Sequence, residues 1–179
     1  QKFWMLPNLL NRQTIYNLRM SGYKELSSLT KVWIYQMNRE FTAPEVNEFD
    51  SLAKTFKENW VSHGKPVKGA IELFHNRFIV LFVDEQDEQS CGRSVDASVR
   101  FMKELEAEFD VTLLDRMLVA YKKDEKIVSC TLAEFRKMID SGSVSESTIV
   151  FNNTIHTITE FKNNWEVPLK QSWHRRMLA

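Results

Sequence analysis

The sequence has few of the features that mark a membrane protein, a disulfide-rich secreted protein or a nucleic-acid-binding protein. Only two of its 179 residues are cysteine. The longest uninterrupted apolar run, residues 78–83, is far shorter than the ~20 residues that a transmembrane helix needs. Lysine plus arginine and aspartate plus glutamate both number 24, so no excess charge attracts nucleic acid or an anionic membrane. We therefore expect a cytoplasmic protein with reduced thiols and with neither nucleic acid nor a membrane among its partners.

The sequence also lacks the short motifs of common cofactor and catalytic sites. No GxxxxGK[ST] loop is present to hold phosphates, so we do not expect ATPase activity. No HExxH motif occurs, and the histidines, at positions 63, 75, 156 and 174, are too scattered to predict a zinc site. The GxSxG turn of serine hydrolases is absent as well. We expect no cofactor and no metal, and these absences favour a protein that is not an enzyme.

The composition is that of a folded chain, with 43% hydrophobic and 27% charged residues. Residues 1–31 differ in texture from the rest and are interpreted as an N-terminal extension, with a helix expected at 14–26. Residues 32–121 are expected to form the core. Residues 122–179 are expected to form a smaller C-terminal unit that packs on that core.

Six segments of the core have the length and periodicity of secondary structure. They are a strand at 32–36, a helix after Thr42, strands at 67–74 and 78–83 joined by a turn, a helix after Ser94 and a strand at 117–121. Thr42 and Glu45 have the spacing of a capping box, which fixes the start of the first helix. The order βαββαβ predicts an α+β fold of the ferredoxin-like type, in which helices cover one face of an antiparallel sheet.

The C-terminal unit has its own signals. Thr131 with Glu134, and Thr157 with Glu160, form two further capping boxes, and a short strand is expected at 149–151. Gly142 is expected to end the helix that starts after Thr131. Because residues 78–83 are all apolar, both faces of that strand should be covered. The C-terminal unit is the available cover for the face without helices, and a partner chain is the alternative.

The polar loop of residues 84–96 is the most site-like segment, because it joins the most apolar strand to a helix start. Gly92 lets the backbone turn, Arg93 offers a guanidinium for an oxyanion, and Ser94 is expected to cap the helix. The candidate ligand-binding residues are Ser90, Cys91, Gly92, Arg93, Ser94 and Asp96. A capped helix start without a ligand is the competing interpretation, since Asp96 in the first turn would itself satisfy the helix dipole.

We predict non-catalytic binding of a small anion or of another protein. The alternative is an enzyme that uses Cys91, whose thiolate a helix start would stabilise. A second form of that alternative uses Asp84, Glu85 and Asp96 for acid–base or Mg²⁺ chemistry. Carboxylates that converge in a pocket would favour the enzyme.

Several segments together resemble a family of short bacterial proteins often labelled "ABC transporter ATPase". They are VWIYQ, NREFT, WVSHG, RFIVLFVDEQ, SVDASVRF, TIVFNN and NNWEVP, and the resemblance extends from Val32 to about His174. The label implies a nucleotide-binding ATPase, although the chain has no phosphate-binding loop. The family's pattern resembles SGCSID at the positions that residues 91–96 occupy in this sequence. Arg93 takes the position of the family's cysteine, whereas Ser94 and Asp96 match the pattern.

Overall fold

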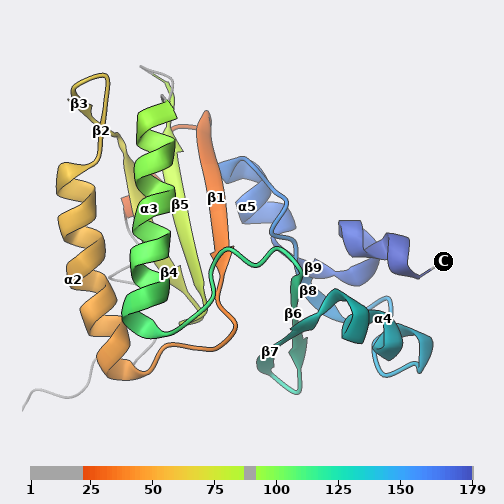
Figure 1. The fold of residues 1–179 in the computed structure, drawn as a ribbon. Coiled ribbons are helices and arrows are strands. Elements are labelled where there is room, and N and C mark those ends of the chain that lie inside the picture. The colour runs from red at the N-terminus through yellow and green to blue at the C-terminus, as the bar shows by residue number, and fades with distance from the viewer. Residues whose placement is uncertain (1–21, 87–91, 179) are drawn as a thin grey trace, which may run out of the picture.

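The computed structural model describes residues 22–86 and 92–178 (Figure 1). It is an α+β protein that contains antiparallel sheets and several helices. In these ranges, no helix has both the length and the apolar character that crossing a membrane requires. Most of the helix predicted at 14–26 lies outside the described residues, and its described end is the 3₁₀ helix η1 (Gly22–Glu25).

Three antiparallel strands form the first sheet, in the order β1-β5-β4. They are β1 (Thr30–Gln36), β4 (Gly69–Phe74) and β5 (Phe78–Asp84). In the predicted ferredoxin-like sheet, the strands at 32–36 and 78–83 are adjacent central strands. They are neighbours here, but only β5 is central and β1 lies at the edge. The predicted β4–β5 hairpin is also confirmed, with positive φ angles of 52° at His75 and 51° at Asn76 in its turn.

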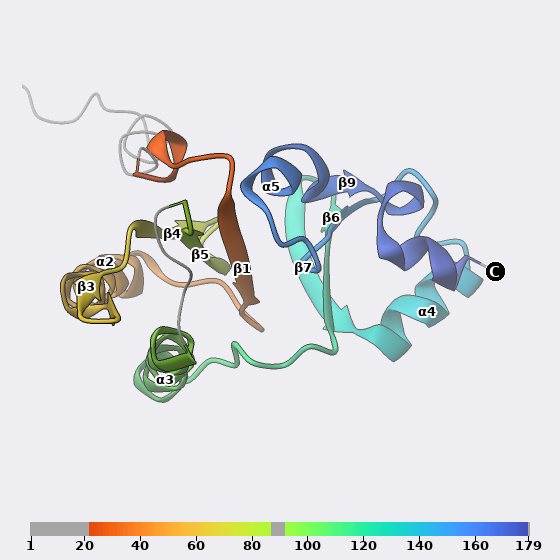
Figure 2. The same cartoon turned by 90° about the horizontal axis from the view of Figure 1, so that it is seen from above.

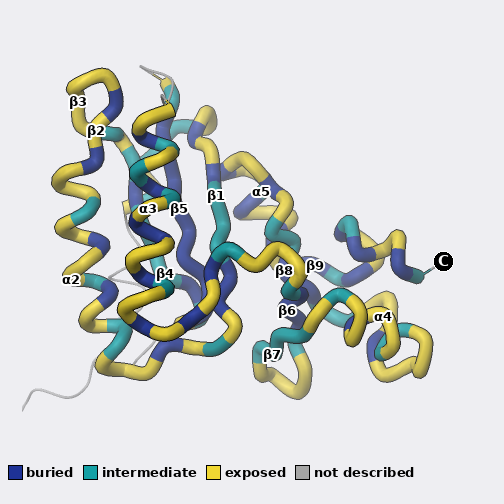
Figure 3. Tube along the Cα trace, viewed as in Figure 1, coloured by how far each residue is buried: buried dark blue, intermediate teal, exposed yellow. Residues whose placement is uncertain are grey.

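Two helices cover one face of this sheet (Figure 1). They are α2 (Ala43–Asn59) and α3 (Gly92–Phe109). The capping box of Thr42 and Glu45 is present at the start of α2, as predicted. The outer sides of both helices are exposed, whereas β5 is buried at each of its seven positions (Figure 3). The core on this face includes Phe49 and Ala53 of α2, Met102 and Leu105 of α3, and Ile79, Leu81 and Val83 of β5.

The predicted fourth strand of this sheet lies in a different sheet. β6 (Leu118–Lys123) belongs to a second antiparallel sheet of order β7-β6-β8-β9. Its other members are β7 (Lys126–Thr131), β8 (Ile149–Phe151) and β9 (Glu166–Pro168). The coarse prediction of an α+β fold is confirmed, but a complete ferredoxin-like sheet is not, because β6 does not pair with β1.

Local pairing explains this difference. β6 and β7 form a hairpin with six paired positions, and its turn has positive φ angles of 48° at Asp124 and 63° at Glu125. The other edge of β6 pairs with β8, so neither edge of β6 is left for β1. The outer edge of β1 instead meets the segment that precedes the helix at Ile158–Asn164. There the Val32 N–H donates to the His156 carbonyl at 2.9 Å.

The C-terminal half also covers the second face of the first sheet. Helix α5 (Ile158–Asn164) lies beside β1 on the side away from α2 and α3 (Figure 2). Phe161 of α5 and Trp165 pack on Phe74 of β4, with ring centroids 5.0 and 5.4 Å from the Phe74 ring. This second core cluster combines Val32, Phe78, Val80 and Phe82 with Phe151, Ile155 and Ile158.

Helix α4 (Leu132–Asp140) and α5 both begin with the predicted capping boxes. Gly142 follows α4 with a φ of 75°, which is the left-handed conformation expected after a helix end. The chain continues into the short 3₁₀ helices η2 (Leu169–Gln171) and η3 (Trp173–Met177). These elements pack with β6 and β8 in a third core cluster.

Candidate functional site

A groove of about 910 Å³ lies between the first half of α3 and the hairpin that follows α2. The α3 side is lined by Gly92, Arg93, Asp96, Ala97 and Arg100. The opposite side is lined by Asn59, Val61, His63 and Gly64. Three of the predicted site residues, Gly92, Arg93 and Asp96, therefore line one groove.

The hairpin side of the groove was not predicted. Strands β2 (Val61–Ser62) and β3 (Lys65–Pro66) pair through a two-residue turn, with φ angles of 49° at His63 and 79° at Gly64. A two-residue turn with both φ angles positive matches the twist of paired strands, and glycine favours it. The sequence analysis expected no strand between the helix after Thr42 and residue 67. A search for two-residue turns with glycine in second place would have found the hairpin.

Helical periodicity produces the other side. Positions 93, 96, 97 and 100 are separated by three, four and seven residues, so they share one face of α3. The residues Ser94, Ser98 and Phe101 are buried in the interior instead. The Trp60 indole Nε1 donates a hydrogen bond to the Ser94 carbonyl at 2.9 Å, which fixes the first turn of α3 against the end of α2.

Two predictions for this helix start are wrong. Helix α3 begins at Gly92, so Ser94 is its third residue and cannot be the N-cap. Asp96 is the fifth residue, and the first turn of α3 contains no acidic side chain. Serine is a common N-cap residue, and the prediction of a cap depended on this residue type alone. Ser94 is instead completely buried, and its carbonyl accepts a hydrogen bond from Trp60. Ser90 and Cys91 lie outside the described residues.

The charged side chains of the groove have no ion-pair partner among the described residues. Within the described part of the chain, neither Arg93, Arg100 nor Asp96 forms an ion pair, and all three are exposed. Two guanidinium groups and one carboxylate give the groove a net positive charge even when His63 is neutral. The N-terminal end of α3 adds a partial positive charge that no first-turn acid offsets. The first turns of α2, α4 and α5 each contain a glutamate.

The carboxylates of the enzymatic alternative do not converge on the groove. Burial would raise the pKa of Asp84, but hydrogen bonds from Ser27, Gln86 and Lys68 outweigh it and lower the pKa to about 2. Glu85 forms an ion pair with Lys31, with 2.6 Å between Oε2 and Nζ. In residues 22–86 and 92–178, no three potential ligands gather into a metal-binding group. Asp84 and Glu85 thus have structural roles.

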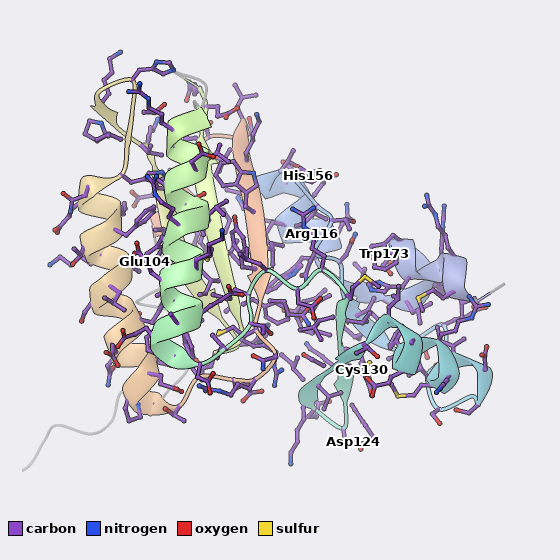
Figure 4. All side chains as sticks on the ribbon, viewed as in Figure 1. Glu104, Arg116, Asp124, Cys130, His156 and Trp173 are labelled. Carbon is purple, nitrogen blue, oxygen red and sulfur yellow. The ribbon has the colours of Figure 1, made fainter. Side chains whose placement is uncertain are left out.

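Cys130, the cysteine that the structure describes, does not line the groove, and neither do His156 and Trp173. Cys130, His156 and Trp173 come from separate elements of the C-terminal unit (Figure 4). Burial, with a smaller contribution from Glu134, raises the pKa of Cys130 to about 11. The thiol is therefore protonated and a weak nucleophile at neutral pH.

Comparison of the chain with protein-family models, curated proteins and solved structures found no match. The resemblance to the bacterial family labelled "ABC transporter ATPase" stays a prediction. The groove must accordingly be interpreted from its own residues.

Arg100 is the most informative residue that the sequence analysis missed, and its separation of seven positions from Arg93 is the signal that could have identified it.

Proposed function

We propose that the protein is a non-catalytic binding module for small anions and that the groove along α3 is its binding site. The observation that carries this proposal is the pair Arg93 and Arg100, which face one groove without an ion-pair partner among the described residues. A guanidinium group binds carboxylate or phosphate through two parallel hydrogen bonds. Two such groups on one wall, with no partner in residues 22–86 and 92–178, are suited to take their counter-charge from a ligand.

The dimensions and the local charge support the same proposal. A volume of about 910 Å³ lies in the range of about 300–1,000 Å³ that is typical of small-molecule sites. The whole chain carries no net charge, so the positive groove is a local feature. Attraction of an anion would therefore be specific to this place. From the reduced-thiol composition and the family resemblance, we place this function in a bacterial cytoplasm.

The enzymatic alternative has less support. Asp84 and Glu85 are held by neighbouring side chains, and only Asp96 of the three carboxylates lines the groove. Asp96 and His63 both line the groove, but in the described part of the chain no hydrogen bond or ion pair joins them, so they do not form an acid–base pair. Binding without catalysis is the simpler interpretation of these contacts.

Thermal unfolding with and without phosphate or sulfate tests the proposal. We expect a ligand at about 100 times its Kd to stabilise the parent protein by about 2.7 kcal/mol. Arg93→Ala and Arg100→Ala should each reduce this protection, and the double variant should lose most of it. Because both side chains are exposed, the unliganded variants should remain within about 0.5 kcal/mol of the parent.

Arg176→Ala is the matched control, because Arg176 is also exposed but lies on η3 in the C-terminal unit. This variant should keep the full protection. The proposal is rejected when no anion changes the melting temperature of the parent. It is also rejected when the Arg93 and Arg100 variants gain as much protection as the control.

A further inference from the structure

The order of charges along the groove carries information about the shape of the ligand, provided that the proposed anion site is correct. Arg93 and Arg100 are seven residues apart on one face of α3. At 1.5 Å per residue, their backbone positions are separated by about 10 Å along the helix axis. Asp96 lies between them on the same side of the helix. The wall of the groove thus has the charge order positive, negative, positive.

This order disfavours a compact anion that contacts both arginines. Such an anion would have to lie near the middle of the wall, where the Asp96 carboxylate repels it. A compact anion at either end avoids Asp96 but uses only one guanidinium group. A ligand with two separated anionic groups can use both arginines while it keeps negative charge away from Asp96.

The middle of the groove is suited to an uncharged segment. Ala97 lies between the arginines on α3 and packs on the core between α2, α3 and the first sheet. Val61, on the facing hairpin, lines the opposite side of the groove. Val61 is 49% exposed, and among the large hydrophobic side chains of the described residues only Leu29 and Met117 are more exposed. A hydrocarbon segment placed between Ala97 and Val61 would remove apolar surface from water.

We propose that the groove binds a linear organic dianion. Its two acidic groups bind Arg93 and Arg100, and its uncharged middle lies between Ala97 and Val61. Carboxylate and phosphate groups share the chemistry that guanidinium recognises, so the proposal specifies two oxyanions at a set separation. An extended chain reaches about 3.6 Å per three backbone atoms, or about 1.2 Å per atom, so about six to ten methylene groups span the two arginines.

The test is calorimetric titration of the full chain with α,ω-dicarboxylates from butanedioate to hexadecanedioate, a series that extends beyond the expected peak. Monocarboxylates of equal carbon number form the reference series, because each added methylene group raises affinity through burial alone. We expect the ratio of dicarboxylate to monocarboxylate affinity to peak at six to ten methylene groups. At the peak, this ratio should be about tenfold above that for butanedioate, since the second charge-assisted contact adds to the first.

Variants show which residues produce the peak. Arg93→Ala and Arg100→Ala should each remove it and leave the affinity of the dicarboxylate near that of the monocarboxylate, whereas Arg176→Ala should keep it. Asp96→Asn should raise the affinity for inorganic phosphate roughly fivefold, because a nearby negative charge is removed. The same variant should weaken the preference for long dicarboxylates. A series of alkane bisphosphonates then shows which oxyanion is preferred, and a peak in either series supports the proposal.

The outcomes separate this inference from the proposed function. Phosphate protection that depends on Arg93 or Arg100, together with an affinity ratio that does not change with chain length, overturns the dianion proposal and leaves the anion site standing. A ratio that rises steadily without a peak also overturns it. Failure of every anion to bind overturns both.

Discussion

Trp60 determines where the groove forms. Its side chain is buried, its ring lies 5.2 Å from that of Phe56, and its indole Nε1 donates to the Ser94 carbonyl. The residue directly after it begins β2, so one side chain fixes both walls of the groove relative to each other. Trp60 follows Phe49, Ala53 and Phe56 at spacings of three and four residues, which is a helical pattern that predicts a buried side chain. It could not predict the polar partner, because that partner is a backbone group 34 residues further along the chain.

His174 is a buried residue whose titration should be measurable. It is 2% exposed, its Nδ1 lies 2.8 Å from the Ser172 Oγ, and its ring packs on Phe135 and Trp173. Burial lowers the pKa of His174 to about 4. In the unfolded chain the histidine pKa is about 6.5, so at pH values between these two the unfolded state binds a proton that the folded state does not.

We therefore expect the free energy of unfolding to fall as the pH falls from about 6.5 to 4. The contribution of His174 between pH 7 and pH 5 should be about 2 kcal/mol. Urea unfolding at several pH values measures it. In His174→Gln this part of the pH dependence should disappear, whereas His156→Gln, which changes an exposed histidine, should retain it. Equal pH dependence in parent and His174→Gln would show that His174 does not titrate as proposed.

Helix starts were predictable because their signals are local. All three capping boxes are present, and each depends on a threonine and a glutamate three residues apart. The start of α3 was predicted wrongly, because Ser94 was taken as its cap and is instead a buried residue within the helix. The partner of β6 was also predicted wrongly. Strand order depends on competition between distant segments: the short hairpin loop brings β7 to one edge of β6, and β8 pairs with the other edge.

The capping box of α4 can be tested directly. The Thr131 Oγ1 accepts a hydrogen bond from the Glu134 N–H at 3.2 Å, and the Glu134 carboxylate accepts from the Thr131 N–H at 2.8 Å. We expect Thr131→Ala to reduce the free energy of unfolding by about 1 kcal/mol. Thr131→Ser keeps the hydroxyl and should cost much less in chemical denaturation. An alanine variant as stable as the serine variant would contradict a stabilising role for this cap.

The two sheets share one apolar cluster and a chain of polar contacts. The Trp165 Nε1 donates to the Asn153 Oδ1 at 3.0 Å, and the Asn153 Nδ2 donates to the Gln36 Oε1 at 2.8 Å. Ser129 of β7 accepts hydrogen bonds from Gln36 and from Arg77, the residue after the β4–β5 turn. These contacts join β1 and the β4–β5 turn to the second sheet. The sequence predicted that the second face of β5 needs a cover, but it could not identify these partners.

We accordingly expect both sheets to unfold in one transition. Phe161→Ala removes a side chain of α5 that contacts Phe74 and Phe82 of the first sheet. The substitution should cost about 3–5 kcal/mol. Native-state hydrogen exchange should show a similar loss of protection in β5 and in β8, although Phe161 belongs to neither strand. A loss confined to residues 118–178 would mean that the sheets unfold independently.

The shared cluster also has a consequence for synthesis on the ribosome. Val80 and Phe82 are made long before Phe161 and Trp165, which cover them, because about 80 residues separate β5 from Trp165. At about 5–20 residues per second, the nascent chain presents this apolar strand face for roughly 4–16 s before its cover is made. During that interval the growing polypeptide is a substrate for chaperones that bind apolar segments, and slow translation of residues 84–165 should increase its aggregation.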